Sequence, residues 1–311
     1  MAINHLPFSM LPEAEYSYQQ WRAWKLSNYP KVPSEVIVQI ENPFALSQKE
    51  KSLIAECLLK SNIAIYTINN RSDFADKKIV KKMGQEFGLN DLDANLGADN
   101  DSITSLQVIA GGRKQGYIPY SNHKLSWHTD GYYNLPHQQI RGVILHCAYN
   151  AVEGGENALL DHEMMYIHLR DRDRAYISAL MEPEVLTIPA NIENGVEIRS
   201  EQTGPVFSID ENSGALHMRY SARKRNIVWT DNNITTEAVN EIDDFLASDS
   251  SLILRHRLKP GQGLICNNVL HNRTSFENGE TPEEQRLIFR GRYYDRLTNT
   301  SFSDVVKAMS Q

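Results

Sequence analysis

The chain has 311 residues, of which 41% are hydrophobic and 23% are charged, and its formal net charge at pH 7 is −7. This composition is typical of a globular protein with a sizeable core and argues against a disordered or fibrous chain. The negative charge argues against a nucleic-acid partner, whose phosphates require clustered Lys and Arg, and the lack of a long apolar run argues against a membrane protein.

The first 100 residues predict helices that alternate with a strand. Ser47 and Glu50 have the spacing of a capping box, which predicts the start of a helix over residues 47–60. The apolar residues that recur on one face of this helix are Leu53, Ile54, Cys57 and Leu58. Residues 62–68 are rich in β-branched and aromatic side chains and predict a strand, and a second helix is expected to end at Gly88.

From about residue 102 onward, short apolar runs are separated by turn residues. These runs cover residues 105–109, 140–149, 158–160, 206–209, 215–220, 263–266 and 286–294. Many short strands predict a mainly β fold with flanking helices (α+β), built as a sandwich, jelly roll or barrel. Helical patterns interrupt the strands at about 163–181 and 235–247.

No linker, internal repeat or low-complexity segment divides the chain, so we expect one domain over residues 1–311. In this domain a part rich in helix and strand, residues 1–100, packs on a β core with helical insertions over residues 101–295. Residues 1–35 contain aromatic residues and prolines without a clear period, and no element is assigned to them.

His128 and Asp130 place an imidazole and a carboxylate two residues apart. On an extended strand both side chains point to the same side, so both could reach one metal ion. A pair of this kind also arises by chance, and taken alone it is more often a surface or a hydrogen-bonded histidine.

His271 follows a Pro-Gly turn at 260–261 and a short apolar strand. From this position a second imidazole could complete a facial triad of two His and one carboxylate, which leaves three positions on Fe(II) open for co-substrate and O2. Imidazole and carboxylate suit Fe(II), whereas a structural zinc site usually has closely spaced Cys ligands. The alternative is a histidine that stabilises the turn.

Three arginines, Arg286, Arg290 and Arg292, recur at even spacing in the last predicted strand and therefore share one face. Leu287 and Phe289 face the other side. Buried guanidiniums are costly unless they meet anions, and a dicarboxylate is a matched partner. The alternative is a solvated edge strand.

The order and spacing of these three features resemble the taurine dioxygenase family of Fe(II)- and 2-oxoglutarate-dependent oxygenases, across residues 120–295. Within that family, three further segments resemble the glutarate hydroxylase branch. They are Glu-Gly-Gly-Glu-Asn-Ala-Leu-Leu at 153–160, Pro-Val-Phe-Ser-Ile-Asp at 205–210 ahead of His-Met-Arg-Tyr at 217–220, and Leu-Ile-Cys-Asn-Asn at 264–268.

The resemblance implies a double-stranded β-helix (jelly roll) core with the metal at its open end. It implies that His128, Asp130 and His271 bind Fe(II) and are the catalytic residues. It further implies the following ligand-binding residues: Arg286 and Asn157 for 2-oxoglutarate, and Arg290, Tyr132 and Arg219 for the substrate. The gap from His271 to Arg286 is longer than usual in the family, so Arg290 and Arg292 remain alternatives for binding 2-oxoglutarate.

The implied activity is hydroxylation of a small anionic organic substrate, with O2 and 2-oxoglutarate consumed and succinate and CO2 released. Demethylation and desaturation remain open, and so does a homo-oligomer. Two other hypotheses remain open. One is a zinc-dependent hydrolase, which the ligand types allow, and the other is a non-catalytic jelly-roll module that binds an anion. The three cysteines have no Cys-x-x-Cys spacing, which predicts a reducing, cytoplasmic location.

Overall fold

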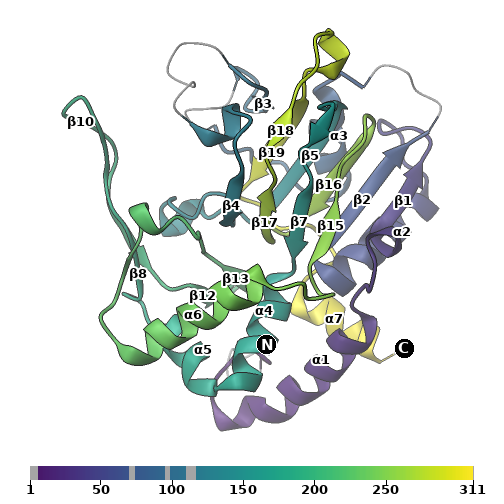
Figure 1. Cartoon of the computed structure of the whole chain (residues 1–311). Coiled ribbons are helices and arrows are strands. Elements are labelled where there is room, and N and C mark those ends of the chain that lie inside the picture. Colours follow the sequence, from purple (N-terminus) through teal and green to yellow (C-terminus); the bar gives the residue numbers. More distant parts are fainter. Residues whose placement is uncertain (1–5, 70–73, 95–98, 110–116, 311) are drawn as a thin grey trace.

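A computed structural model of the chain describes residues 6–69, 74–94, 99–109 and 117–310. Two β-sheets form the centre of the fold (Figure 1). The larger sheet has six strands in the order β1 (Ile37–Ile40), β2 (Ile63–Ile68), β16 (Gln262–Cys266), β5 (Gly142–Tyr149), β19 (Leu287–Tyr293) and β3 (Thr104–Leu106). The smaller sheet has four, in the order β15 (Leu254–His256), β7 (Asn157–Leu160), β17 (Leu270–Arg273) and β4 (Leu125–His128). Only β1 and β2 pair in parallel in these two sheets; their other pairings are antiparallel.

The inner faces of the two sheets meet in one apolar cluster, in which Leu145 and Leu264 of the larger sheet pack with Leu159 of the smaller sheet. Because side chains alternate along a strand, the same faces also receive polar residues. On β17, Leu270 packs on the outer side and His271 lies opposite Leu159 in the strand pairing. Alternation thus directs His271 into the space between the sheets.

Two helices cover the outer face of the larger sheet. They are α2 (Gln48–Ser61) and α3 (Lys78–Glu86), whose apolar residues pack with those of β2 and β19. The predicted capping box is confirmed: the Ser47 hydroxyl accepts from the Glu50 N–H at 3.3 Å, and the Glu50 carboxylate accepts from the Ser47 N–H at 2.6 Å.

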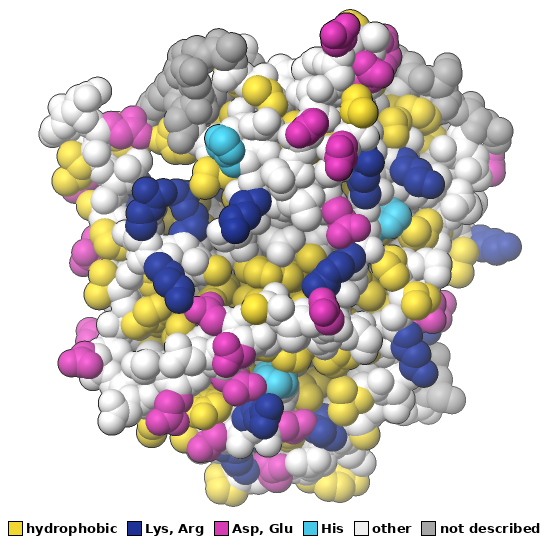
Figure 2. Space-filling model, viewed as in Figure 1, with side chains coloured by type: hydrophobic (Ala, Val, Ile, Leu, Met, Phe, Trp, Pro, Cys, Tyr) yellow, Lys and Arg dark blue, Asp and Glu magenta, His cyan; other side chains and the backbone are white. Residues whose placement is uncertain are grey.

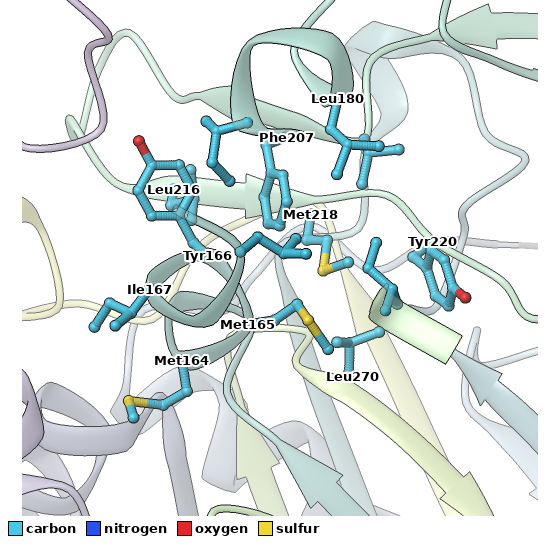
Figure 3. Close-up of a cluster of buried hydrophobic side chains, with 14 of the residues drawn as sticks. Met164, Met165, Tyr166, Ile167, Leu180, Phe207, Leu216, Met218, Tyr220 and Leu270 are labelled. Carbon is cyan, nitrogen blue, oxygen red and sulfur yellow. The ribbon is translucent and has the colours of Figure 1, made fainter. Parts of the chain in front are cut away.

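A layer of helices covers the outer face of the smaller sheet: α1 (Glu15–Asn28), α4 (His162–Arg172), α5 (Arg174–Leu180) and α6 (Asn233–Ala247), with α7 (Phe302–Met309) beside them. Figure 3 shows side chains of α4 and β17 meeting in this cluster. The helix predicted over 163–181 is two helices, because Asp173 is extended and its carboxylate caps the second one at the Ala175 N–H.

The remaining strands form small sheets: β8 (Leu186–Ile188) with β11 (Gln202–Gly204) and β14 (Val228–Trp229), β9 (Asn191–Glu193) with β10 (Val196–Arg199), β12 (Phe207–Ile209) with β13 (Leu216–Met218), and β6 (Glu153–Gly154) with β18 (Phe276–Glu277). Residues 186–204 project from the body at the left of Figure 1, and we call them the arm. Within the described ranges, no helix is long and apolar enough to cross a membrane.

Candidate metal centre and co-substrate site

The structure brings His128, Asp130 and His271 together. One potential ligand atom from each residue lies within 4.8 Å of the others, and all three residues are buried. The two histidines lie opposite each other in the pairing of β17 with β4. Asp130, in contrast, is not on a strand: β4 ends at His128, and the chain turns at Gly131, whose φ is +66°. The expectation that one extended strand carries both ligands is therefore wrong for Asp130.

Both imidazoles are held by the backbone. Nδ1 of His128 lies 2.9 Å from the Ser126 carbonyl oxygen, and Nδ1 of His271 lies 2.9 Å from that of Val269. Because a carbonyl only accepts, each Nδ1 carries a hydrogen, and Nε2 is the nitrogen left to face a metal. Burial, followed by the nearby His271, lowers the pKa of His128 to about 3, so this ring is neutral at pH 7.

The carboxylate of Asp130 has one paired and one unpaired oxygen. Its Oδ1 accepts from Nη1 of Arg290 at 2.9 Å, and Nη1 of Arg292 lies 3.9 Å away. Its Oδ2 is buried and accepts no hydrogen bond from any described residue. Burial raises the pKa of Asp130, but Arg290 and Arg292 hold it well below its usual value, so the group is ionised. Two imidazoles and one carboxylate with an orphaned oxygen fit a divalent cation.

Asn268 fixes the backbone around Asp130. Its Oδ1 accepts from the Asp130 N–H at 2.8 Å, and its Nδ2 donates to the carbonyls of Asp130 at 2.9 Å and Ile140 at 2.6 Å. Asn268 itself has a φ of 47°, a left-handed conformation that Asn tolerates better than most residues. Asn268 is not among the site residues predicted from the sequence, although an Asn-Asn pair between a buried strand and His271 is a signal for such a turn.

Arg286 lies directly before β19 and is only 5% exposed. Its side chain makes no hydrogen bond or ion pair with the described part of the chain, and its guanidinium carbon lies 5.1 Å from the centre of the Phe276 ring. Burial lowers the pKa of Arg286 to about 10. A Cβ atom on Gly155 would lie 3.4 Å from Nε of Arg286, so the Gly-Gly segment at 154–155 leaves room for this arginine.

Arg273 is a second buried arginine, which the sequence analysis missed. It is 4% exposed and lies two residues after His271 on β17, hence on the same inner face. Its Nη2 donates to the carbonyls of Ser121 at 2.9 Å and His123 at 2.5 Å, while its buried Nε has no partner among the described residues. Burial and the nearby Arg286 lower the pKa of Arg273 to about 9. Its even spacing from His271 was the available signal.

Asn157, predicted to bind 2-oxoglutarate, lies on β7 opposite Arg273 in the strand pairing and is buried. Its Nδ2 donates to the carbonyl of Asn272 at 3.0 Å. The structure therefore places Asn157 beside Arg273.

The predicted substrate residues have partners within the protein. Arg290 pairs with Asp130, as described above. Arg219 donates to four backbone carbonyls, those of Tyr132, Leu186, Gln202 and Gly204. These bonds tie the arm to the turn that follows Asp130. Tyr132 contributes its carbonyl to this arrangement, and its ring packs edge-on against Tyr133 at 5.1 Å.

Arg199 on the arm is a further candidate that the sequence analysis did not single out. Its guanidinium carbon lies 5.5 Å from the centre of the Tyr133 ring, and that of Arg292 lies 5.8 Å from the same ring. Arg199 donates to the carbonyls of Pro189 and Ser200 but forms no ion pair within the described ranges. In Figure 2, basic side chains gather between the arm and the smaller sheet.

Residues 26–292 match the family model described as taurine catabolism dioxygenase TauD, TfdA family. The chain belongs to this family. The membership confirms the predicted enzyme class, the non-haem iron dioxygenases that use Fe(II), 2-oxoglutarate and O2. Neither the zinc hydrolase nor the anion-binding module is supported.

A uridine-5'-phosphate dioxygenase from an Amycolatopsis species is 31% identical to this TauD-family chain over 172 residues, which cover 54% of the chain and 60% of that relative. The match thus spans less than two thirds of the relative's length. AAD-2 in complex with Mn(II) and N-oxalylglycine is similar in structure, with a TM-score of 0.60 and 11% identity over 85% of this chain and 96% of that one. The oxygenase OrfP with Fe and α-ketoglutaric acid has a TM-score of 0.56 and 15% identity over 80% of each chain. These likenesses confirm the mixed helix and strand fold.

Proposed function

We propose that this TauD-family protein hydroxylates a small anionic organic substrate at the expense of O2 and 2-oxoglutarate, with release of succinate and CO2. One observation carries the proposal: the buried Asp130 has a carboxylate oxygen without a partner in the described residues, beside two imidazoles whose Nδ1 atoms are bound to backbone carbonyls. Bound Fe(II) would supply the activation of O2, coupled to oxidative decarboxylation of 2-oxoglutarate.

The protein's own residues hold the ligands and tune their charge. His128, Asp130 and His271 would bind the metal, with the carbonyls of Ser126 and Val269 fixing the two rings. Arg290 and Arg292 keep Asp130 ionised without covering its second oxygen.

Arg286 would bind the distal carboxylate of 2-oxoglutarate, because it is a buried cation with no anion of its own, and Asn157 lies nearby to donate a hydrogen bond. Arg290 is a less suitable alternative, since its guanidinium already donates a hydrogen bond to Asp130. Arg292 is less suitable for the same reason, because it pairs with Asp93.

The substrate side lies toward the arm. Arg290, Tyr132 and Arg219 were predicted to bind the substrate. In this proposal Arg290 pairs with Asp130, and Arg219 binds the Tyr132 carbonyl and thereby holds the arm. Arg199, which lies beside the Tyr133 ring, binds the anionic group of the substrate. The resemblance to glutarate hydroxylases and the relative named for uridine-5'-phosphate agree on one chemical feature, a substrate that carries an anionic group.

We further propose that the two facing sheets are the halves of a jelly-roll core and that the chain forms one dioxygenase domain. The shared apolar cluster between the sheets supports this. Cys57, Cys147 and Cys266 are all free thiols, which supports a reducing cytoplasmic location.

Succinate formation tests the activity. Purified protein with Fe(II), 2-oxoglutarate and air is incubated with a panel of acids that includes glutarate and uridine-5'-phosphate. We expect at least one anionic acid to stimulate succinate release in the wild-type protein and in H137A, whose exposed imidazole serves as the control, and not in H271A. Equal succinate release by wild type and H271A would overturn the proposal.

A further inference from the structure

We propose that Arg273 is a second binding residue for the distal carboxylate of 2-oxoglutarate, so that a pair of arginines, Arg273 and Arg286, holds this group. This inference rests on the proposed function and deepens it. It concerns a residue that lies between the metal ligand His271 and the expected co-substrate arginine.

The two guanidiniums come from different sheets and contact the same aromatic ring. Arg273 belongs to β17 of the smaller sheet, and Arg286 lies directly before β19 of the larger sheet. Their guanidinium carbons lie 4.8 Å and 5.1 Å from the centre of the same Phe276 ring. Phe276 is itself buried, so its ring closes this region against solvent.

The distance from the metal centre suits a short dicarboxylate. Arg273 follows His271 by two residues on an extended strand, which is about 6.6 Å of backbone at about 3.3 Å per residue. A molecule that chelates a metal at His271 with one end would therefore extend along the strand toward Arg273 with its other end. Asn157, opposite Arg273, lies on the same path.

The charges in this region do not balance. Both arginines are more than nine-tenths buried, and neither forms an ion pair with a carboxylate of the described residues. The carbonyls of Ser121 and His123 orient Nη2 of Arg273 but contribute no net charge, and its buried Nε has no partner. Two like charges out of water are unfavourable unless an anion joins them. A carboxylate shared by both guanidiniums meets this requirement.

A purely structural role for Arg273 is the competing explanation, since its two carbonyl bonds tie residues 121–123 to β17. Ligand length separates the two explanations. Oxalate can chelate a metal through two oxygens but has no distal carboxylate, whereas 2-oxoglutarate has one. Loss of a binding residue affects only 2-oxoglutarate, and loss of a structural contact affects both ligands.

The test is calorimetric titration of the Fe(II)-loaded protein without oxygen, where no turnover occurs. Arg273→Gln and Arg286→Gln should each weaken 2-oxoglutarate binding about 10- to 100-fold, as expected for a charged hydrogen bond, and leave oxalate affinity unchanged. Arg273→Lys keeps the charge and should give a smaller loss of the same selectivity, which also serves if the Gln variant does not fold. Arg255→Gln, an arginine on β15 that is exposed and 3.8 Å from Asp249, is the control and should bind like wild type.

Wild-type affinity for 2-oxoglutarate in both Arg273 variants, or an equal loss for 2-oxoglutarate and oxalate, would overturn the inference. Failure of the wild-type protein to bind 2-oxoglutarate at all would instead overturn the proposed function. The two failures are therefore distinguishable.

Discussion

His128 and His271 lie directly opposite each other in the pairing of β4 with β17, and the centroids of their rings are 4.3 Å apart. Each ring donates from Nδ1 to the carbonyl two residues earlier in its own chain segment, which leaves Nε2 as the ligand atom. With Nδ1 of each ring bound to a carbonyl, the two rings form no hydrogen bond with each other. A metal cation bound by both Nε2 atoms and neutralised in part by Asp130 would explain why the two rings are held at this distance.

Asn268→Ala should lower Fe(II) affinity about 10- to 100-fold, the usual effect of losing a residue that positions a metal ligand. The variant loses three hydrogen bonds that fix the backbone of Asp130 and Ile140. Anaerobic metal titration measures the effect. Asn299→Ala is a matched control, because Asn299 also has a positive φ, of 60°, but is exposed and far from the metal ligands in sequence. Equal losses in both variants would point to backbone strain alone.

Gly155→Ala should raise the Kd for 2-oxoglutarate about fivefold, or about 1 kcal/mol, because the new methyl group would lie in contact with Arg286 and restrict the positions that its side chain can take when it binds a carboxylate. The control is Gly195→Ala. Gly155 and Gly195 have φ values of +74° and +79°, so the backbone penalty is similar, but a Cβ on Gly195 meets no described atom within 4 Å. A raised Kd in both variants would contradict a specific contact with Arg286.

Lys25→Met should destabilise the fold by about 3–5 kcal/mol, because it leaves two buried carboxylates without their cation. Nζ of Lys25 lies 2.6 Å from Asp161 and 2.5 Å from Glu163, and the lysine is fully buried. Chemical denaturation measures the change. Lys307→Met is the control: its ion pair with Asp304 is at the surface, so the loss should stay below about 1 kcal/mol. Similar losses in both variants would show that the buried network contributes little.

The free energy of unfolding should fall as the pH drops below about 6.5, in part because of His162. This histidine is buried, and burial lowers its pKa despite the nearby Asp161 and Glu163. The unfolded chain therefore takes up a proton at a pH where the folded chain does not. His162→Gln should reduce the slope by at most about 1.4 kcal/mol per pH unit between about pH 6 and 5, relative to wild type and to the exposed-site variant His137→Gln. An unchanged slope would mean that His162 is protonated in the folded state.

The sequence predicted the elements whose signals are local. One example is the capping box formed by Ser47 and Glu50. Another is the alternation along β19, where Ile288 packs between the sheets and Phe289 packs on the outer face. Arg290 then points between the sheets again and pairs with Asp130. Helix α1 was missed because Lys25 occupies a buried position of its inner face, where an apolar residue would have revealed the period. Its partners, Asp161 and Glu163, are more than 130 residues away.

The site was predictable in its ligands and less so in their surroundings. Spacing identified His128 and His271, but it could not show that Asp130 lies in a turn held by Asn268. It placed Arg290 on the inner face, but only the fold shows that Asp130 engages it and that Arg273 lies near Arg286. Such pairings depend on which strands become neighbours, and local patterns in the sequence do not reveal that.

The most direct test of the proposed metal centre is the visible absorption spectrum of the protein with Fe(II) and 2-oxoglutarate in the absence of oxygen. A chelated complex gives a charge-transfer band, and we expect it in the wild-type protein at one Fe(II) per chain, with no band in His271→Ala while the circular dichroism spectrum remains that of a folded protein. A wild-type protein without the band, or a His271→Ala variant that retains it, would contradict the assignment of His128, Asp130 and His271 as the iron site.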